Sequence, residues 1–309
     1  MKGRGGLPRV FKMKKFVIVT DSCSDLSLDL REKYSVDYIP MHFSFNDADY
    51  VADLDWGTFS PREFYDVMRN GTRIFTSQVN AQEYVEAFEA YINEGYDILS
   101  ISCSAALSAS VKASYAARDT VMEKYPDAKI ICIDSLISCG GLALLCMKAA
   151  MLRDEDKTIE EVAAWVEENK LNFHQEATVD KLIYLKQSGR ISAASAFFGG
   201  LLNIKPIIIS DVKGRNVSVE KVKGRSVSIK RLAERFAESY VECDLPIIIS
   251  HADSLEDAEA ARAELLKLYP NADIIIGYVG PIVGASVGPG TLCIYYYGTK
   301  ETFDADTEA

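Results

Sequence analysis

Serine-rich turns that follow apolar runs carry the residue types of this sequence best suited to binding chemistry. Residues 97–114 begin with an apolar run that reads as a buried parallel strand, become rich in serine, and then take up a helical pattern. In an open α/β sheet such a turn lies in the crevice at the carboxyl end of the strand, where the free N–H groups of the next helix favour an anion. Small hydroxyl side chains there suit a carboxylate or a phosphate, and they suit close packing of the helix on the sheet equally well.

Two more polar segments are expected near the same edge of the sheet. The apolar run 16–20 leads directly into Asp21, whose negative charge would repel a phosphate. Asp21 is therefore expected to cap a helix or to hydrogen-bond the segment around Thr76. Residues 74–78 show no periodicity and carry several small polar groups, and a further apolar run, 129–133, ends in another polar turn. Polar turns thus follow at least three predicted strands.

Helix signals alternate with these strands through the first half of the chain. Ser60, Asn80 and Thr158 each precede a glutamate by three residues, a spacing typical of a helix-starting capping box. Residues 36–45 alternate like a single strand, and the apolar stretch 140–152 predicts a buried helix. This alternation of strands and helices predicts a mostly parallel, doubly wound sheet.

The second half of the chain has a different pattern. The segments 201–210 and 216–222 predict the two arms of a hairpin, and a hairpin among helices is typical of an α+β domain. The sequence therefore predicts an α/β protein with an N-terminal domain over 13–165 and a smaller C-terminal domain over 166–300. The other predicted elements are helices over 182–187, 227–240 and 254–268, strands over 246–250, 273–278 and 291–297, and a glycine-rich loop over 280–290.

Composition narrows the class of protein. The chain has 309 residues, 48% of them hydrophobic, and a formal net charge of -11, which argues against nucleic acid or an anionic membrane as a partner. No apolar run reaches the length of a membrane span, and the N-terminus lacks the apolar core of a signal peptide. The seven cysteines are scattered without zinc spacing, which suits a reducing cytoplasm, and three distant histidines suggest no metal cluster.

The sequence contains one common catalytic motif, in a context that does not suit it, and lacks the common nucleotide-binding motifs. Residues 284–288 match the G-x-S-x-G nucleophile elbow around Ser286, but that elbow needs a following helix and a later histidine. No histidine follows His251, and the context argues against a serine hydrolase. No phosphate-binding or dinucleotide glycine fingerprint is present, which argues against a nucleotide site.

Arg190 and the segment after it allow two interpretations each. Gly189 and Arg190 follow a predicted helix, where the glycine ends the helix and the arginine complements its dipole. Arg190 is equally placed to face the same anion as the serines. The apolar residues after it, interleaved with Gly199 and Gly200, fit either a core or a pocket with room for a ligand.

Seven ordered motifs between residues 15 and 298 give this chain a resemblance to the DegV family. The motifs are V-T-D-S-C-S-D-L at the first strand, Thr76-Ser77-Gln78, Leu107-Ser108-Ala109-Ser110, Asp134-Ser135 with Ser138-Cys139-Gly140-Gly141, residues 182–191, residues 201–206, and residues 280–290.

The resemblance implies a bacterial, cytoplasmic protein that binds a long-chain fatty acid between an N-terminal parallel α/β domain and a smaller C-terminal domain. It implies no cofactor, no metal and no catalytic residue in this chain. Some members of the family present the bound carboxylate to a separate, ATP-binding fatty acid kinase subunit, so such a kinase is an expected partner. The resemblance places the carboxylate on Thr76, Ser77, Ser108, Ser110 and Arg190, and it places Phe197, Phe198, Leu201, Ile204, Ile282 and Ser286 in the acyl pocket or the loop beside it.

The chain departs from the family pattern at four places. Val79 stands where a proline is usual, Ala109-Ser110 replaces glycine-threonine, and Ser188 replaces the first glycine before the arginine. Ser286 stands where the family commonly has a histidine close to the lipid head group. Two alternatives therefore stay open: an acyl ester or acyl phosphate hydrolase or transferase that uses Ser286, and a regulatory protein in which the lipid is structural.

Overall fold

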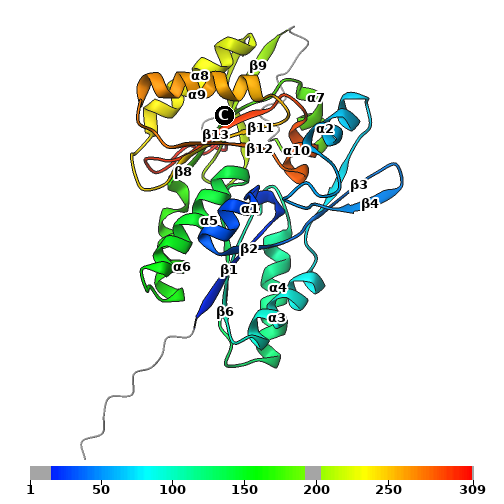
Figure 1. Cartoon of the computed structure of the whole chain (residues 1–309), viewed down its shortest axis with the longest axis vertical. Coiled ribbons are helices and arrows are strands. Elements are labelled where there is room, and N and C mark those ends of the chain that lie inside the picture. The colour runs from blue at the N-terminus through cyan, green and yellow to red at the C-terminus, as the bar shows by residue number, and fades with distance from the viewer. Residues whose placement is uncertain (1–14, 192–202, 308–309) are drawn as a thin grey trace, which may run out of the picture.

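A four-stranded parallel sheet forms the amino-terminal end of the molecule, shown in Figure 1 as a computed structural model that describes residues 15–191 and 203–307. Its strand order is β2-β1-β6-β7, and every neighbouring pair is parallel. Helices α3 and α4 cover one face of the sheet, and α1, α5 and α6 cover the other (Figure 1), so the predicted doubly wound arrangement is confirmed. The elements are β1 (Phe16–Asp21), α1 (Leu28–Tyr34), β2 (Val36–Ile39), α3 (Ala81–Asn93), β6 (Asp97–Ser102), α4 (Ser110–Lys124), β7 (Ile130–Asp134), α5 (Cys139–Asp154) and α6 (Ile159–Asn169).

A six-stranded mixed sheet forms the second half of the fold, with the order β10-β9-β8-β13-β11-β12. Strands β9 and β10 form the predicted antiparallel hairpin, and β11 and β12 form a parallel pair. Helices α8 and α9 cover the outer face of this sheet (Figure 1). The elements are β8 (Phe173–Thr178), α7 (Leu182–Ser188), β9 (Ile204–Ser210), β10 (Asn216–Lys223), α8 (Arg225–Ser239), β11 (Ile247–His251), α9 (Leu255–Leu268), β12 (Ile274–Tyr278), α10 (Pro281–Val287) and β13 (Leu292–Tyr297).

Helix α5 lies between the two sheets and is buried along almost its whole length (Figure 1). A side chain on Gly140 would come within 2.6 Å of the Tyr295 ring of β13, and one on Gly141 would come within 2.3 Å of Ile137. The two glycines therefore allow the helix to approach the second sheet closely. The apolar stretch 140–152, which predicts a buried helix, thus belongs to the helix that packs against both sheets.

The predicted strand over 36–45 is wrong, because this segment forms two strands in different sheets. Pro40 lies between β2 and β3 (His42–Phe45), and a proline has no N–H group to continue a ladder. Strand β3 instead joins a small antiparallel sheet of order β4-β3-β5, with β4 at Ala48–Val51 and β5 at Phe75–Ser77. The unpatterned segment 74–78 is therefore in part a strand that places Thr76 opposite Phe43.

Two further elements differ from the sequence expectation. The glycine-rich segment 280–290 is not a loop throughout, because residues 281–287 form α10, which starts with a proline at its first position. Strand β8 was not predicted, because its polar run His174-Gln175-Glu176 lacks the apolar pattern expected of a strand in the centre of a sheet. All three predicted capping boxes are present, at Ser60 before α2 (Pro61–Arg69), at Asn80 and at Thr158.

We propose that the chain passes from its first domain to its second between α6 and β8. The predicted boundary at residues 165 and 166 lies inside α6, which packs with α5 and with the parallel sheet.

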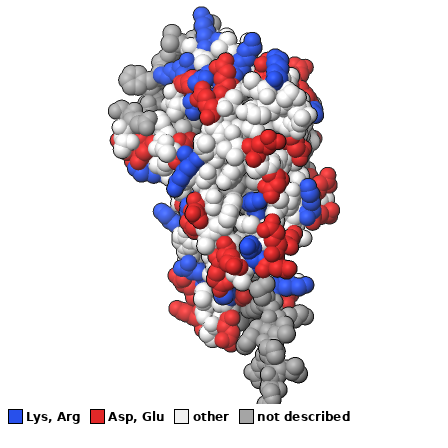
Figure 2. Space-filling model, turned by 90° about the vertical axis from the view of Figure 1, so that its left-hand side faces the viewer, with Lys and Arg blue, Asp and Glu red and all other residues white. Residues whose placement is uncertain are grey.

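Figure 2 shows acidic and basic side chains interspersed over one face of the molecule. Within residues 15–191 and 203–307, no helix is both long enough and apolar enough to cross a membrane.

Replacing Gly288 by alanine is expected to lower the free energy of unfolding by about 2 to 4 kcal/mol, from left-handed strain plus overpacking. Gly288 has φ +79°, and a side chain there would lie 2.1 Å from the Tyr184 ring. Urea unfolding measures the change, with Gly277→Ala as the control because nothing lies within 4 Å of that position. Equal stabilities of the two variants would contradict this account of Gly288.

Candidate ligand-binding site

A cavity of about 530 Å³ lies at the carboxyl edge of the parallel sheet, against α10 and the small sheet. Its volume falls in the range of about 300 to 1,000 Å³ that is usual for small-molecule sites. Segments from both halves of the chain form its wall, so neither half could form it alone. Six of the residues predicted for the site line it: Thr76, Ser77, Ser108, Arg190, Ile282 and Ser286.

Ser108 lies in the turn that leads from β6 into α4, as the strand–turn–helix pattern predicts. The N–H of Ser110 donates to Ser108 Oγ at 3.2 Å, and the two hydroxyl oxygens are 3.0 Å apart. The N-cap residue of α4 is Ala109, whose side chain cannot accept a hydrogen bond, so Ser108 Oγ bonds the first N–H of the helix in its place. The turn therefore offers the Ser108 hydroxyl together with the positive end of a 15-residue helix.

Ser110 lies behind Ser108 and is not among the residues that line the cavity. Its side chain is fully buried, and its Oγ accepts a hydrogen bond from the Val79 N–H at 3.3 Å. It therefore connects the α4 turn to the segment that follows β5. In this geometry Ser110 holds Ser108 in place, and any contact of Ser110 with a ligand is indirect.

Thr76 and Ser77 reach the cavity from β5, the edge strand of the small sheet. Thr76 pairs with Phe43 and Ser77 pairs with His42 in the neighbouring strand β3. The Thr76 side chain is half-buried, whereas Ser77 is exposed at the rim. Thr76 and Ser108 therefore supply hydroxyl groups from two separate segments to one cavity.

Asp21 lies beneath the site, and within the described residues its carboxylate makes its hydrogen bonds away from the segment around Thr76. Its carboxylate accepts hydrogen bonds from the backbone N–H of Cys23 and from that of Cys103, each at 2.9 Å. The first bond caps a short 3₁₀ helix, as one of the two predictions for Asp21 required, and the second connects β1 to the turn after β6. Burial raises the pKa of Asp21 from its ordinary value of 3.8 to about 6.

Arg190 follows Gly189, the left-handed residue that ends α7 with φ +67°. The guanidinium donates to the Ser188 carbonyl at the end of that helix, which fits the helix-end interpretation, and Arg190 also lines the cavity, so its contact with an anion stays a prediction. Asn216 at the start of β10 donates to the Arg190 carbonyl at 3.3 Å and accepts from Gln175 at 3.0 Å. Asn216 lines the cavity, and no local signal in the sequence marked it.

Apolar side chains cover much of the cavity wall. Ile282 is 5% exposed, and Met41 and Cys103 are still more deeply buried. The sequence did not mark Met41 or Cys103 as ligand contacts, because methionine and cysteine in apolar runs are ordinary core residues. The apolar or sulfur-bearing residues of the lining are Cys23, Met41, Cys103, Ala105, Ala106, Leu107, Ala109, Ile282, Val283 and Val287.

The other predicted pocket residues are not part of this lining. Ile204 begins β9, where it pairs with Lys223, and it is not among the residues that line the cavity. Phe197, Phe198 and Leu201 lie outside the described residues.

Ser286 lies in the last turn of α10 and not at a strand-to-helix elbow. No hydrogen bond to its hydroxyl occurs within the described part of the chain, and the three histidines have other partners. His42 contacts Glu83 at 2.7 Å, His174 contacts the Thr299 carbonyl at 2.5 Å, and His251 accepts from the Ser254 N–H at 3.1 Å. The geometry therefore provides Ser286 with no histidine base. Residues 15–191 and 203–307 also contain no group of three or more metal-binding side chains.

An α/β fold with a hydroxyl-lined, partly apolar cavity between its sheets defines a class of small-molecule-binding protein. The family model described as "Uncharacterised protein, DegV family" matches residues 15–299, and the chain belongs to this family. A DegV domain-containing protein of Clostridium perfringens is 39% identical over 94% of this chain and 100% of its own length.

Solved structures of the same fold agree with this assignment. DegV of Bacillus subtilis, described as a fatty acid binding protein, superimposes with a TM-score of 0.78 at 29% identity, covering 93% of this chain and 100% of its own. A DegV lipid binding protein of Thermotoga maritima gives a TM-score of 0.78 at 26% identity over the same shares of the two chains.

Asp21→Asn is expected to change how the stability of the protein depends on pH. Between about pH 4 and pH 6 the folded protein holds a proton on Asp21 that the unfolded chain has released, because the folded pKa is raised to about 6. The contribution of Asp21 to the free energy of unfolding therefore falls as pH rises through this interval and is constant above about pH 7. Urea unfolding at several pH values measures it, and a wild-type-to-variant difference that does not vary with pH would refute the raised pKa.

Proposed function

We propose that this protein binds a long-chain fatty acid, with the carboxylate on the hydroxyls of Thr76 and Ser108 and the acyl chain along the apolar wall. The observation that carries the proposal is one cavity that combines two hydroxyl groups, the start of helix α4 and Arg190 with a set of apolar side chains. A carboxylate suits such a polar end, because it accepts several hydrogen bonds and is favoured by the helix dipole. The lipid-binding relatives in the family support the same ligand class.

The two ends of such a ligand would contribute differently to affinity. Burying roughly fifteen methylene groups at about 0.8 kcal/mol each amounts to about 12 kcal/mol before the costs of association are subtracted. A hydrogen bond to a charged group contributes only about 1.5 to 3 kcal/mol. The acyl chain would therefore supply most of the affinity, and the hydroxyls would fix which end of the ligand faces the rim.

Ser108→Ala and Thr76→Val are each expected to weaken fatty acid binding about tenfold, because each removes one hydrogen bond to a charged group. Mass spectrometry of the lipid released on denaturation identifies the ligand, and competition with a fluorescent fatty acid measures affinity. Thr120→Val serves as the control, since Thr120 lies on the same helix α4 and does not line the cavity, and its hydroxyl donates to the Ala116 carbonyl of its own helix. Unchanged affinity in both site variants would contradict the assignment of the carboxylate to Thr76 and Ser108.

We further propose that the loaded protein presents its carboxylate to an ATP-dependent fatty acid kinase subunit and is not itself an enzyme. Exposed Ser77 and Arg190 put the polar end of the cavity at the surface, within reach of a second chain. A cytoplasmic location fits this function and the cysteines, all seven of which are free thiols.

With a fatty acid kinase subunit and ATP, the loaded protein is expected to yield an acyl phosphate, which hydroxylamine traps as a hydroxamate. Ser286→His is expected to raise the rate and to leave fatty acid affinity within about twofold, because a histidine adds a donor and proton carrier beside the carboxylate. Ser286→Ala is the matched control for loss of the hydroxyl. Absence of hydroxamate with wild type and with Ser286→His would rule out presentation to a kinase and leave the binding proposal intact.

A further inference from the structure

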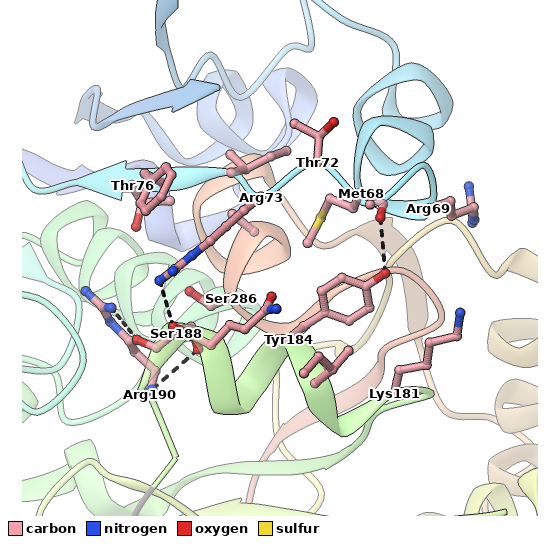
Figure 3. Close-up of a pocket in the computed structure, with 16 residues that line it drawn as sticks. Met68, Arg69, Thr72, Arg73, Thr76, Lys181, Tyr184, Ser188, Arg190 and Ser286 are labelled. Carbon is pink, nitrogen blue, oxygen red and sulfur yellow. Dashed lines mark hydrogen bonds between the residues drawn. The ribbon is translucent and has the colours of Figure 1, made fainter. Parts of the chain in front are cut away.

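A second cavity, of about 300 Å³, adjoins the first at its polar end. The two cavities have Thr76, Arg190 and Ser286 in common. The walls of the second cavity come from the end of α2, the segment leading into β5, and helix α7 (Figure 3). A group bound there would lie directly beside the proposed site of the carboxylate.

Cationic side chains dominate this second cavity. Arg69, Arg73, Lys181 and Arg190 line it, and its described lining contains no aspartate or glutamate. Such a concentration is unusual in a chain whose net charge is -11. Figure 3 shows Arg73 and Arg190 directed toward the same end of α7, with Lys181 at the other end of that helix.

Only Arg69 among these four has its charge balanced by carboxylates in the described chain. Its guanidinium lies 2.6 Å from Asp253 and 2.8 Å from Asp66. Within residues 15–191 and 203–307, Arg73, Lys181 and Arg190 have no ion-pair partner. Three unbalanced positive charges around one small cavity attract an anion with more than one negative charge.

Arg73 is held in position for such a contact. Its guanidinium lies 4.6 Å from the centre of the Phe75 ring and donates to the Gln187 carbonyl at 2.9 Å. Both contacts fix the orientation of the side chain, and they leave other N–H donors of the guanidinium free. A fork of donors held in this way loses little conformational entropy when it binds a phosphate or carboxylate.

We propose that the second cavity binds a phosphate-bearing group, held by Arg73 and Lys181, beside the head group of the fatty acid. Phosphate fits better than a carboxylate because three cations without carboxylate partners in the described chain line one small cavity, and a phosphate chain carries several negative charges close together. The phosphate comes from a phosphoryl donor or from a lipid headgroup. Its closeness to a carboxylate rests on the proposed function, whereas the charge of the cavity does not.

Titration calorimetry of fatty-acid-loaded protein with inorganic triphosphate tests the site. Arg73→Gln and Lys181→Gln are each expected to weaken triphosphate binding about tenfold, the effect of losing one charge-assisted contact. Rising ionic strength should weaken wild-type binding in the same direction. Lys186→Gln is the matched control, since Lys186 is an exposed lysine of the same helix α7 that does not line the cavity.

Fatty acid affinity and vesicle binding, measured on the same variants, separate the remaining outcomes. Vesicle binding that requires both cations, with no binding of triphosphate, would assign the phosphate to a lipid headgroup and support the site. Failure of both probes to bind, or an equal loss in Lys186→Gln, would overturn it while fatty acid binding persists. Triphosphate binding that depends on Arg73 and Lys181 in a protein that binds no fatty acid would support the site and contradict the proposed function.

Discussion

Burial of α5 between two sheets is the constraint on which the rest of the structure depends. The helix is apolar on nearly all sides, so it is stable only when both sheets cover it. Gly140 and Gly141 both face Tyr295 of β13, and their lack of a side chain lets α5 lie close against the mixed sheet. Since the first cavity takes its walls from both halves of the chain, its shape follows from this packing.

The polar edge of the parallel sheet combines rigid backbone with free side-chain oxygens. The Asp21 carboxylate accepts hydrogen bonds from two backbone N–H groups, and the Ser110 hydroxyl bonds to the Val79 N–H and to the Ser108 hydroxyl. Thr76 has no such bond in the described chain, and it reaches the cavity from another sheet. The buried polar groups therefore hold the turns, while the less buried hydroxyls stay available to a ligand.

Charge is distributed unevenly at the mouth of the site. The chain as a whole has a net charge of -11, yet cationic side chains without carboxylate partners in the described chain line a cavity next to the proposed carboxylate position. Like charges brought together cost free energy unless an anion accompanies them, so this arrangement favours a bound anion. The same argument explains why Arg69, which has Asp66 and Asp253 as partners, adds less to the attraction than Arg73.

The sequence alone determined the features that depend on neighbouring residues: the capping boxes at Ser60, Asn80 and Thr158, the buried helix 140–152, and the serine turn between β6 and α4. These follow from local hydrogen bonding and from hydrophobic periodicity, as does the parallel sheet. Only the tertiary structure decided that 36–45 divides between two sheets, that β8 is central despite its polar residues, and that Asn216 and Met41 line the cavity. It also decided that Arg73 and Lys181, more than a hundred positions apart in the chain, share one space. These features depend on packing between segments that are distant in the chain, and no local pattern of residues shows which distant segments will meet.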